Sequence, residues 1–241
     1  MSAISTIADL TLRSLLGRRR TILLVLLAAL PVVVTLLARV GGDRGDVQEI
    51  LDGLVVRIVL PLSALVLGTS ALGAELEDGT AVYILAKPVP RWQVVVAKLL
   101  VAGALTAALT VGSTLLTALA AAGDGGDVAV AAGYGVAGGL AAFAYTALFM
   151  ALSVVTSRAL IVGLIYTLVW EGVLASILAG TRILSVREAT LAVAGGFADL
   201  NGRTDGALEP VAGVVLLCLA IGLGFVAATN RLMAWEIRAA D

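Results

Sequence analysis

The stretch that decides the fold is TILLVLLAALPVVVTLLARV, from Thr21 to Val40, and Arg39 is its single charged residue. A helix needs about 20 apolar residues to cross the hydrocarbon core of a bilayer. In lipid every backbone N–H and C=O group must be hydrogen-bonded within the segment, which a helix achieves. The run is too long for the apolar region of a typical signal peptide, and no small-residue cleavage site follows it. We therefore interpret it as a transmembrane helix.

Further apolar runs extend this pattern along the chain. They lie at Ile58 to Gly73, Val94 to Ala122, Val128 to Val155, Ala159 to Ala179 and Val211 to Thr229. The first of these is short, and a start before Arg57 is the alternative. Hydrophobic residues make up 60% of the chain, charged residues 14%, and the mean hydropathy is +1.07. A soluble domain could not bury so much apolar surface. The sequence therefore predicts an all-α polytopic membrane protein with six transmembrane helices in a single domain, residues 1–241.

The polar composition excludes several kinds of chemistry. The formal net charge is -1, whereas nucleic-acid binding requires clustered Lys and Arg. The chain has no histidine, and its only cysteine, Cys218, lies in an apolar run. A Cys/His metal site and an internal disulfide are therefore not expected.

Lys and Arg residues are distributed unevenly between the two sides of the predicted spans. Ten of the 16 fall in the N-terminal segment, in and around the connections after the second and fourth spans, and in the C-terminal tail. The opposite side holds the other six and most of the acidic residues. Because cytoplasmic loops are enriched in Lys and Arg, both termini are predicted to be cytoplasmic.

Two segments outside the spans have helical patterns of their own. Residues 1–20 alternate apolar and polar side chains at near-helical spacing, which predicts an interfacial helix on the inner leaflet. A frayed leader is the alternative. Residues 180–210 form the longest external connection, and residues 183–193 are expected to form a helix that lies on or dips into the outer leaflet.

The cytoplasmic connection after the second span is the most elaborate one. It lies within ELEDGTAVYILAKPVPRWQVVVAK, from Glu75 to Lys98, where acidic residues suit the N-terminus of a short helix over residues 81–86. Pro88 and Pro90 bias the residues before them away from the helical conformation. The chain is therefore predicted to leave this helix before the prolines and to enter the next one around Arg91.

This arrangement resembles the first cytoplasmic loop of permease subunits of type 2 ABC exporters. The shared order is an acidic cluster, Gly79 and Thr80, an apolar helix, Lys87 to Arg91, and Lys98 at the start of the next span. In that family the loop contains a coupling helix that inserts into a groove of the ATP-binding subunit. The resemblance implies a coupling loop over residues 74–93. The contact residues that it implies are Gly79, Thr80, Val82, Tyr83, Leu85, Pro88, Pro90 and Arg91.

The resemblance also implies the partners and the location of the chain. It implies a permease in the cell membrane, expected to be a bacterial inner membrane, that pairs with a second copy or a paralogue and exports an amphipathic or lipidic compound. The chain contains no GxxxxGK[ST] motif, the loop that cradles nucleotide phosphates. We therefore expect no enzyme activity and no cofactor in this chain, with ATP and Mg²⁺ bound by two separate ATP-binding subunits.

Polar residues within the spans are candidates for a translocation path. Glu171 is the only acid predicted near mid-membrane, where an ionised side chain is costly and indicates a functional site. A position in water or at a protomer interface is the alternative. Hydroxyl side chains recur at helical spacing on the third span, either to line a cavity or to pack against neighbouring helices. They are Thr106, Thr110, Ser113, Thr114 and Thr117.

Three other functional classes are compatible with parts of this pattern. A secondary transporter driven by an ion gradient requires ionisable groups at mid-membrane, where Glu171 stands nearly alone. An intramembrane enzyme is disfavoured because the chain lacks histidine and the spans hold no carboxylate pair. A non-transporting membrane assembly or immunity factor shares the same layout. No cluster of aromatic or charged residues indicates a particular substrate.

Overall fold

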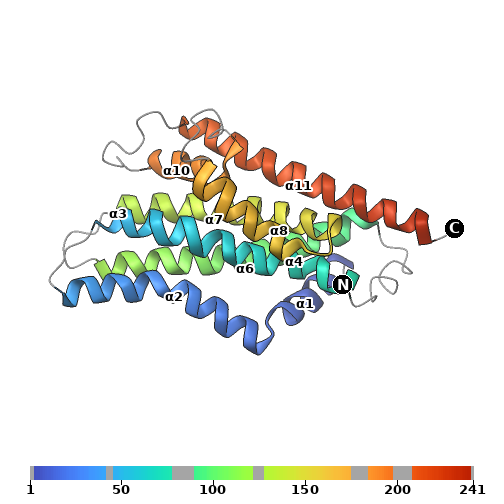
Figure 1. The fold of residues 1–241 in the computed structure, drawn as a ribbon, viewed down its shortest axis with the longest axis horizontal. Helices are drawn as coiled ribbons and strands as arrows, with labels where there is room; N and C mark the ends of the chain where they lie inside the picture. Colours follow the sequence, from blue (N-terminus) through green and yellow to red (C-terminus); the bar gives the residue numbers. More distant parts are fainter. Residues whose placement is uncertain are drawn as a thin grey trace.

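The computed structural model describes residues 3–41, 46–77, 90–121, 128–174, 184–197 and 208–239, and its regular elements in these ranges are helices. Figure 1 shows the long helices side by side along the longest axis of the molecule. In chain order they are α1 (Ala3–Leu15), α2 (Arg18–Val40), α3 (Val47–Ile50), η1 (Leu51–Val59), α4 (Leu60–Glu77), α6 (Arg91–Ala121), α7 (Val128–Val155), α8 (Ala159–Ile165), η3 (Tyr166–Leu174), α10 (Val186–Gly195) and α11 (Pro210–Ala239). The predicted all-α fold is therefore confirmed for the part of the chain that the structure describes.

Five helices in the described ranges are long and apolar enough to cross a membrane. They are Arg18–Val40, Val47–Gly73, Arg91–Ala121, Val128–Val155 and Pro210–Met233. The predicted fifth span, residues 159–179, corresponds to α8 and η3, whose apolar part, Ala159–Gly172, is shorter. Residues 175–183 lie outside the described ranges. The structure therefore has candidates for five of the six predicted spans. At the remaining one, the predicted fifth span, it has a shorter apolar helix.

The second span begins earlier than its hydropathy predicts. Its apolar run starts at Ile58, and the sequence leaves open a start before Arg57. In the structure α3 begins at Val47, and the π-helical segment η1 joins it to α4. Asp46 caps α3, because its carboxylate accepts a hydrogen bond from the backbone N–H of Gln48 at 3.0 Å. The charged residues within η1 interrupt the apolar run in the sequence, yet they find partners on other elements. The helix therefore extends through them.

Helix α7 lies at the centre of the bundle and packs against α4, α6, α10 and α11. Its buried face is rich in alanine and glycine, which allows the neighbouring backbones to come close. A Cβ atom added at Gly138 would lie 2.9 Å from Thr110 Cγ2 on α6. A Cβ atom added at Gly224 of α11 would lie 2.6 Å from the backbone carbonyl carbon of Ala147 on α7. These glycines therefore set the spacing of α7 from two of its neighbours.

Helix α1 is amphipathic and packs against α6 and α4. Its Thr11 and Leu15 side chains are buried, whereas Leu10 and Leu12 are exposed. The extended backbone at Gly17 separates α1 from α2. The prediction of an N-terminal amphipathic helix is therefore confirmed for Ala3–Leu15, and its position on the inner leaflet stays a prediction.

Candidate functional site

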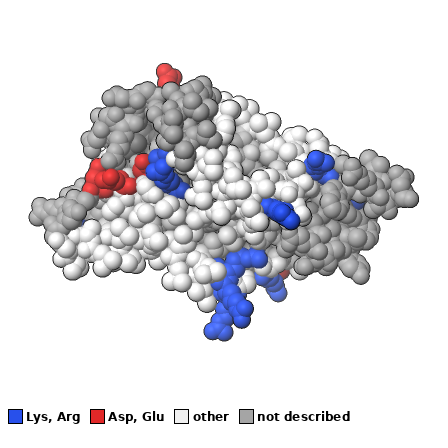
Figure 2. Space-filling model, in the orientation of Figure 1, with Lys and Arg blue, Asp and Glu red and all other residues white. Residues whose placement is uncertain are grey.

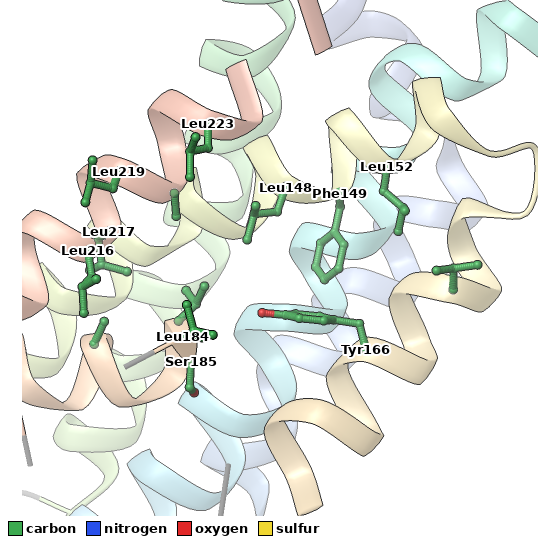
Figure 3. A pocket seen from close by; sticks show the side chains of 14 residues that line it. Leu148, Phe149, Leu152, Tyr166, Leu184, Ser185, Leu216, Leu217, Leu219 and Leu223 are labelled. Atoms are coloured by element: carbon green, nitrogen blue, oxygen red, sulfur yellow. The ribbon is translucent and has the colours of Figure 1, made fainter. Parts of the chain in front are cut away.

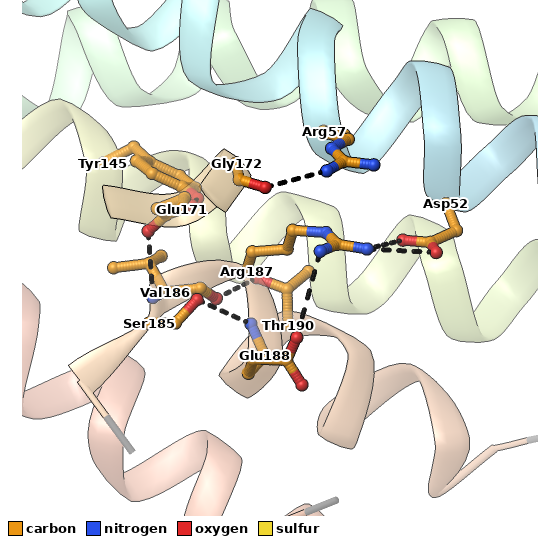
Figure 4. A network of polar contacts seen from close by, with 10 residues as sticks. All are labelled: Asp52, Arg57, Tyr145, Glu171, Gly172, Ser185, Val186, Arg187, Glu188 and Thr190. Carbon is orange, nitrogen blue, oxygen red and sulfur yellow. Dashed lines mark hydrogen bonds and ion pairs between the residues drawn. The ribbon is translucent and has the colours of Figure 1, made fainter. Parts of the chain in front are cut away.

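Glu171 is the centre of a buried hydrogen-bond network that joins three elements. It lies on η3, and only 3% of the residue is exposed. Its Oε1 atom accepts hydrogen bonds at 3.1 Å from the Tyr166 hydroxyl and at 3.1 Å from the backbone N–H of Val186. Its Oε2 atom accepts a hydrogen bond from the Tyr145 hydroxyl on α7 (Figure 4). The carboxylate therefore connects η3 to α7 and to the N-terminus of α10.

These three donors explain how an acidic side chain is accommodated here. A buried carboxylate is costly unless its oxygens accept hydrogen bonds. The first N–H groups of a helix have no partner within that helix, and at the start of α10 Glu171 accepts from one of them. Ser185 caps the same helix, because its hydroxyl accepts from the Glu188 N–H at 3.2 Å. Glu171 and Ser185 together therefore accept from two of the first N–H groups of α10, those of Val186 and Glu188.

A second cluster of charged groups attaches α10 to η1. Arg187 forms an ion pair with Asp52, with its Nη2 atom 3.0 and 3.2 Å from the two carboxylate oxygens (Figure 4). Burial lowers the pKa of the Arg187 guanidinium, but Asp52 and Glu188 raise it above its ordinary value, so the side chain stays charged. The Arg57 Nη2 atom donates to the Gly172 carbonyl at 3.1 Å, beside Glu171. Two arginines thus hold η1 against α10 and η3.

An apolar cavity adjoins the Glu171 network. Its volume is about 520 Å³, and it lies between α7, α8, η3, α10 and α11. Tyr166 belongs to both sites, because its ring lines the cavity (Figure 3) while its hydroxyl donates to Glu171. The other walls are mainly leucine, valine and alanine, with Phe149 and Ser185. A cavity of this lining suits an apolar group rather than an ion.

The predicted hydroxyl stripe of α6 is buried between helices. Thr106, Thr110, Ser113 and Thr117 are at most 2% exposed, and none of them lines the apolar cavity described above. Thr106 and Thr110 donate to carbonyls one turn earlier in α6. Ser113 donates to the Ala28 carbonyl of α2 at 2.7 Å. These contacts are those of helix packing, and a role of the stripe in translocation stays a prediction.

Most of the predicted coupling residues fall outside the described ranges. These are Gly79, Thr80, Val82, Tyr83, Leu85 and Pro88. The other two, Pro90 and Arg91, lie at the start of the next helix, because α6 begins at Arg91 and the Pro90 carbonyl accepts from the Gln93 N–H at 3.0 Å. Their contact with an ATP-binding subunit stays a prediction. Lys98, at the end of the same segment, is buried, and its ammonium group donates to the Ala71 carbonyl of α4.

The sequence singled out Glu171 but not the residues around it. Tyr145, Val186 and Arg187 are 26, 15 and 16 residues from Glu171 in the chain, on α7 and α10. One usable signal is Tyr145 itself, because a tyrosine inside an apolar span needs a partner for its hydroxyl. Asp52 and Arg187 are 135 residues apart in the chain, and nothing in a single sequence pairs them. Among the described residues, no group of three or more His, Cys, Asp or Glu side chains is gathered as a metal site.

Comparison with known proteins gives one family. The family model described as "ABC-2 family transporter protein" matches residues 5–190, which is more than three quarters of the chain. The matched range begins in α1, includes the predicted coupling loop and Glu171, and ends in α10. A search of curated proteins found no match.

Proposed function

We propose that this multi-pass membrane protein is the permease subunit of an ATP-driven exporter, because the chain belongs to the ABC-2 transporter family. In this proposal the chain forms the translocation path with a second permease chain, either a copy or a paralogue. Two separate ATP-binding subunits bind ATP and Mg²⁺ and hydrolyse the nucleotide. The family match over residues 5–190 is the observation that carries the proposal.

The arrangement of the helix ends supports the same proposal. Helix α1 and the C-terminal end of α11 lie at the same end of the molecule (Figure 1). Glu77 and Pro90, which flank the predicted coupling helix, are the last residue of α4 and the residue before α6. An even number of crossings returns the chain to its starting side, so we infer that α8 and η3 belong to a sixth crossing.

The charge distribution supports a cytoplasmic position for that end. Figure 2 shows Lys and Arg side chains gathered over the junction of α1 and α2, and acidic side chains at the opposite end, near α3 and α10. Positively charged flanks favour the cytoplasmic side of a membrane. In this orientation the coupling loop, residues 74–93, faces the cytoplasm, where an ATP-binding subunit can reach it.

The mechanism that we propose is alternating access driven by the partner subunits. ATP-driven closure of the ATP-binding subunits moves the coupling loop, and α4 and α6 transmit the motion, because they are joined by that loop. Helix α7 packs against both α4 and α6 and also against α10 and α11. Motion of α4 and α6 therefore reaches the Glu171 network through α7, since Tyr145 of α7 donates to Glu171.

Co-purification tests the partner, and vesicle transport tests the activity. The tagged chain is co-expressed with the ATP-binding subunit encoded beside it and reconstituted into vesicles. We expect a stable complex whose ATP hydrolysis is required for substrate movement. Full transport by the isolated chain without an ATPase would contradict the proposal. A complex that hydrolyses ATP but moves no substrate would favour a non-transporting assembly.

One observation favours a second candidate, a transporter driven by an ion gradient. Glu171 is a buried acidic side chain beside a cavity, the kind of group that such transporters use to bind a proton or cation. The two candidates differ in their energy source. Transport that continues without ATP and stops when a protonophore collapses the gradient would favour the second candidate.

A further inference from the structure

A polar cavity of about 360 Å³ lies where α2, α4, α7 and α8 meet. Its lining includes two arginines, Arg20 at the start of α2 and Arg158 in the turn between α7 and α8, and no carboxylate among the residues that the structure describes. Five hydroxyl side chains complete its polar lining. They are Thr69, Ser70, Ser153, Thr156 and Ser157. The cavity therefore carries two positive charges among neutral donors, in contrast to the apolar cavity beside Glu171.

Both arginines are available to a ligand. Among the described residues, neither Arg20 nor Arg158 has a carboxylate within ion-pair distance. By comparison, Arg13 pairs with Asp9 at 3.1 Å and Arg187 pairs with Asp52 at 3.0 Å. Guanidinium groups bind phosphate and carboxylate oxygens through paired N–H donors. Two such groups around one cavity provide a site for an anion.

The turn that carries Arg158 leaves further donors for the same anion. The Arg158 backbone N–H donates to Thr156 Oγ1 at 3.2 Å, a contact in which the Thr156 hydroxyl serves as acceptor. Its own hydrogen is not used in that bond, and the exposed Ser157 hydroxyl lies beside it. The hydroxyls of the helices are engaged differently, because Thr69 donates to Leu65 and Ser153 donates to Met150 within their own helices. The anion donors therefore cluster at Arg20 and the turn.

Close packing limits the cavity at the boundary between α4 and α7. A Cβ atom added at Gly73 would lie only 3.2 Å from the Cβ atom of Ser153. Both residues line the cavity, so the two helices leave little space between them at this point. A charged group held by Arg20 and Arg158 therefore has no wide route between α4 and α7.

The edge formed by α8 is apolar and exposed. Leu160 and Ile161 line the cavity and are 53% and 58% exposed. In a helix that belongs to a membrane bundle, such side chains face hydrocarbon. The cavity thus combines cationic and hydroxyl groups with an adjoining lipid-facing surface. A ligand with an anionic head and apolar chains matches both parts.

We propose that this cavity binds the phosphate of an anionic phospholipid, with the acyl chains along the exposed face of α8. The lipid comes from the leaflet at the α1–α2 end of the molecule. Basic pockets between transmembrane helices are suited to such headgroups. The phosphate, with its single negative charge shared over two oxygens, accepts hydrogen bonds from Arg20 and Arg158 and so ties the start of α2 to the α7–α8 turn. This proposal requires neither an ATPase nor transport, and it is tested separately from the proposed function.

The test counts bound lipid by native mass spectrometry of the purified chain in a neutral detergent. The probes are dioleoyl phosphatidylglycerol and dioleoyl phosphatidylcholine, which share acyl chains and differ in net charge. We expect the wild-type chain to prefer the anionic lipid. Each of Arg20→Gln and Arg158→Gln should weaken its binding about fivefold, since one basic group near the lipid surface contributes about 1 kcal/mol. Equal binding of the two lipids by the wild-type chain would overturn the proposal.

The control is Arg19→Gln, an exposed neighbour that does not line the cavity. It should keep the wild-type preference, and a loss equal to that of Arg20→Gln would overturn the assignment to this cavity. If a glutamine variant does not fold, Arg20→Lys and Arg158→Lys keep the charge while removing paired donation, and lipid binding should be weaker than that of the wild-type chain.

Inorganic phosphate distinguishes a bound lipid from a bound free anion. If millimolar phosphate displaces bound phosphatidylglycerol as strongly as added lipid does, the cavity is a site for a free anion, and the proposal of a bound phospholipid is contradicted.

Discussion

At the scale of single residues, the buried side chain of Glu171 connects three elements of the fold. Its carboxylate accepts from two tyrosines and one backbone amide, and these come from η3, α7 and α10. A residue that meets three elements fixes their relative positions. Because the Tyr166 ring also lines the apolar cavity, the shape of the cavity depends on the same contact.

Replacing Glu171 should reduce stability in proportion to the hydrogen bonds that are lost. Glu171→Leu leaves three donors without an acceptor, and each unsatisfied buried donor costs about 1–3 kcal/mol. Glu171→Gln keeps an acceptor oxygen and should cost less. Thermal unfolding in detergent, followed by tryptophan fluorescence, measures both. Equal unfolding temperatures for Glu171→Leu and wild type would contradict this account.

Glu171→Gln also shows whether Glu171 takes part in transport or only holds the neighbouring elements in place. If Glu171 only positions η3 and α10, vesicles containing Glu171→Gln should keep the pH dependence of wild-type transport. If Glu171 binds a proton or a cationic substrate, the variant should lose turnover or change that pH dependence, because the amide does not ionise. Unchanged turnover and pH dependence would remove Glu171 from the transport mechanism.

At the scale of elements, glycines decide how closely α11 approaches α7. Gly224 is buried against the backbone of Ala147, whereas Gly222, on the same helix, has no atom within 4 Å of an added Cβ. The two glycines thus lie on the same helix but have different surroundings. Alanine at either position changes the helix propensity equally, so a difference in stability between the two variants reports the packing of α11 against α7.

Gly224→Ala should therefore destabilise the chain, and Gly222→Ala should not. The added methyl group at Gly224 forces α11 away from α7, and overpacking of this kind costs about 1–3 kcal/mol. Gly222→Ala is the matched control, because it places the same methyl group in open space. Thermal unfolding of the two variants under identical conditions makes the comparison. Equal losses in both would contradict the assigned packing.

The elements show which features a single sequence can predict. Apolar runs of about 20 residues locate spans because lipid imposes that length, and five runs correspond to long helices. The apolar run allows the second span to begin before Arg57 but does not locate its start at Val47, because Asp52 and Arg57 have their partners, Arg187 and the Gly172 carbonyl, far along the chain. The Glu171 network was missed for the same reason. The hydropathy of a short stretch of sequence can be read from that stretch alone. These contacts join elements that are distant in the chain, so they can be seen only once the elements are packed together.

At the scale of the whole molecule, the two ends differ in charge, and this predicts the orientation in the membrane. A single-cysteine series tests it, starting from Cys218→Ser to remove the native thiol. Gly17→Cys reports the α1–α2 junction and Glu49→Cys reports α3, and both positions are exposed. A membrane-impermeant maleimide added to intact cells should label Glu49→Cys and should label Gly17→Cys only after permeabilisation. The reverse pattern would contradict cytoplasmic termini.

The coupling loop gives a second prediction at this scale. Charged replacements at its apolar positions, Tyr83→Glu and Leu85→Glu, should uncouple ATP hydrolysis from transport, because a charge does not fit an apolar groove. The membrane fold should be unchanged, as judged by thermal unfolding. Tyr83→Phe keeps the apolar ring and should keep coupling. Full coupling in both glutamate variants would contradict a docking role for the loop.

The small side chains of α7 bear on how such a molecule can move. Alanine and glycine have no rotamers to rearrange, and buried alanines recur along α7 at 137, 141, 144, 147 and 151. A neighbouring helix that shifts along these positions meets only methyl groups, whereas elsewhere on α7 it must move past the buried side chains of Tyr145, Phe149 and Met150. Small displacements of a packed helix therefore require the least side-chain rearrangement at the alanine positions of α7.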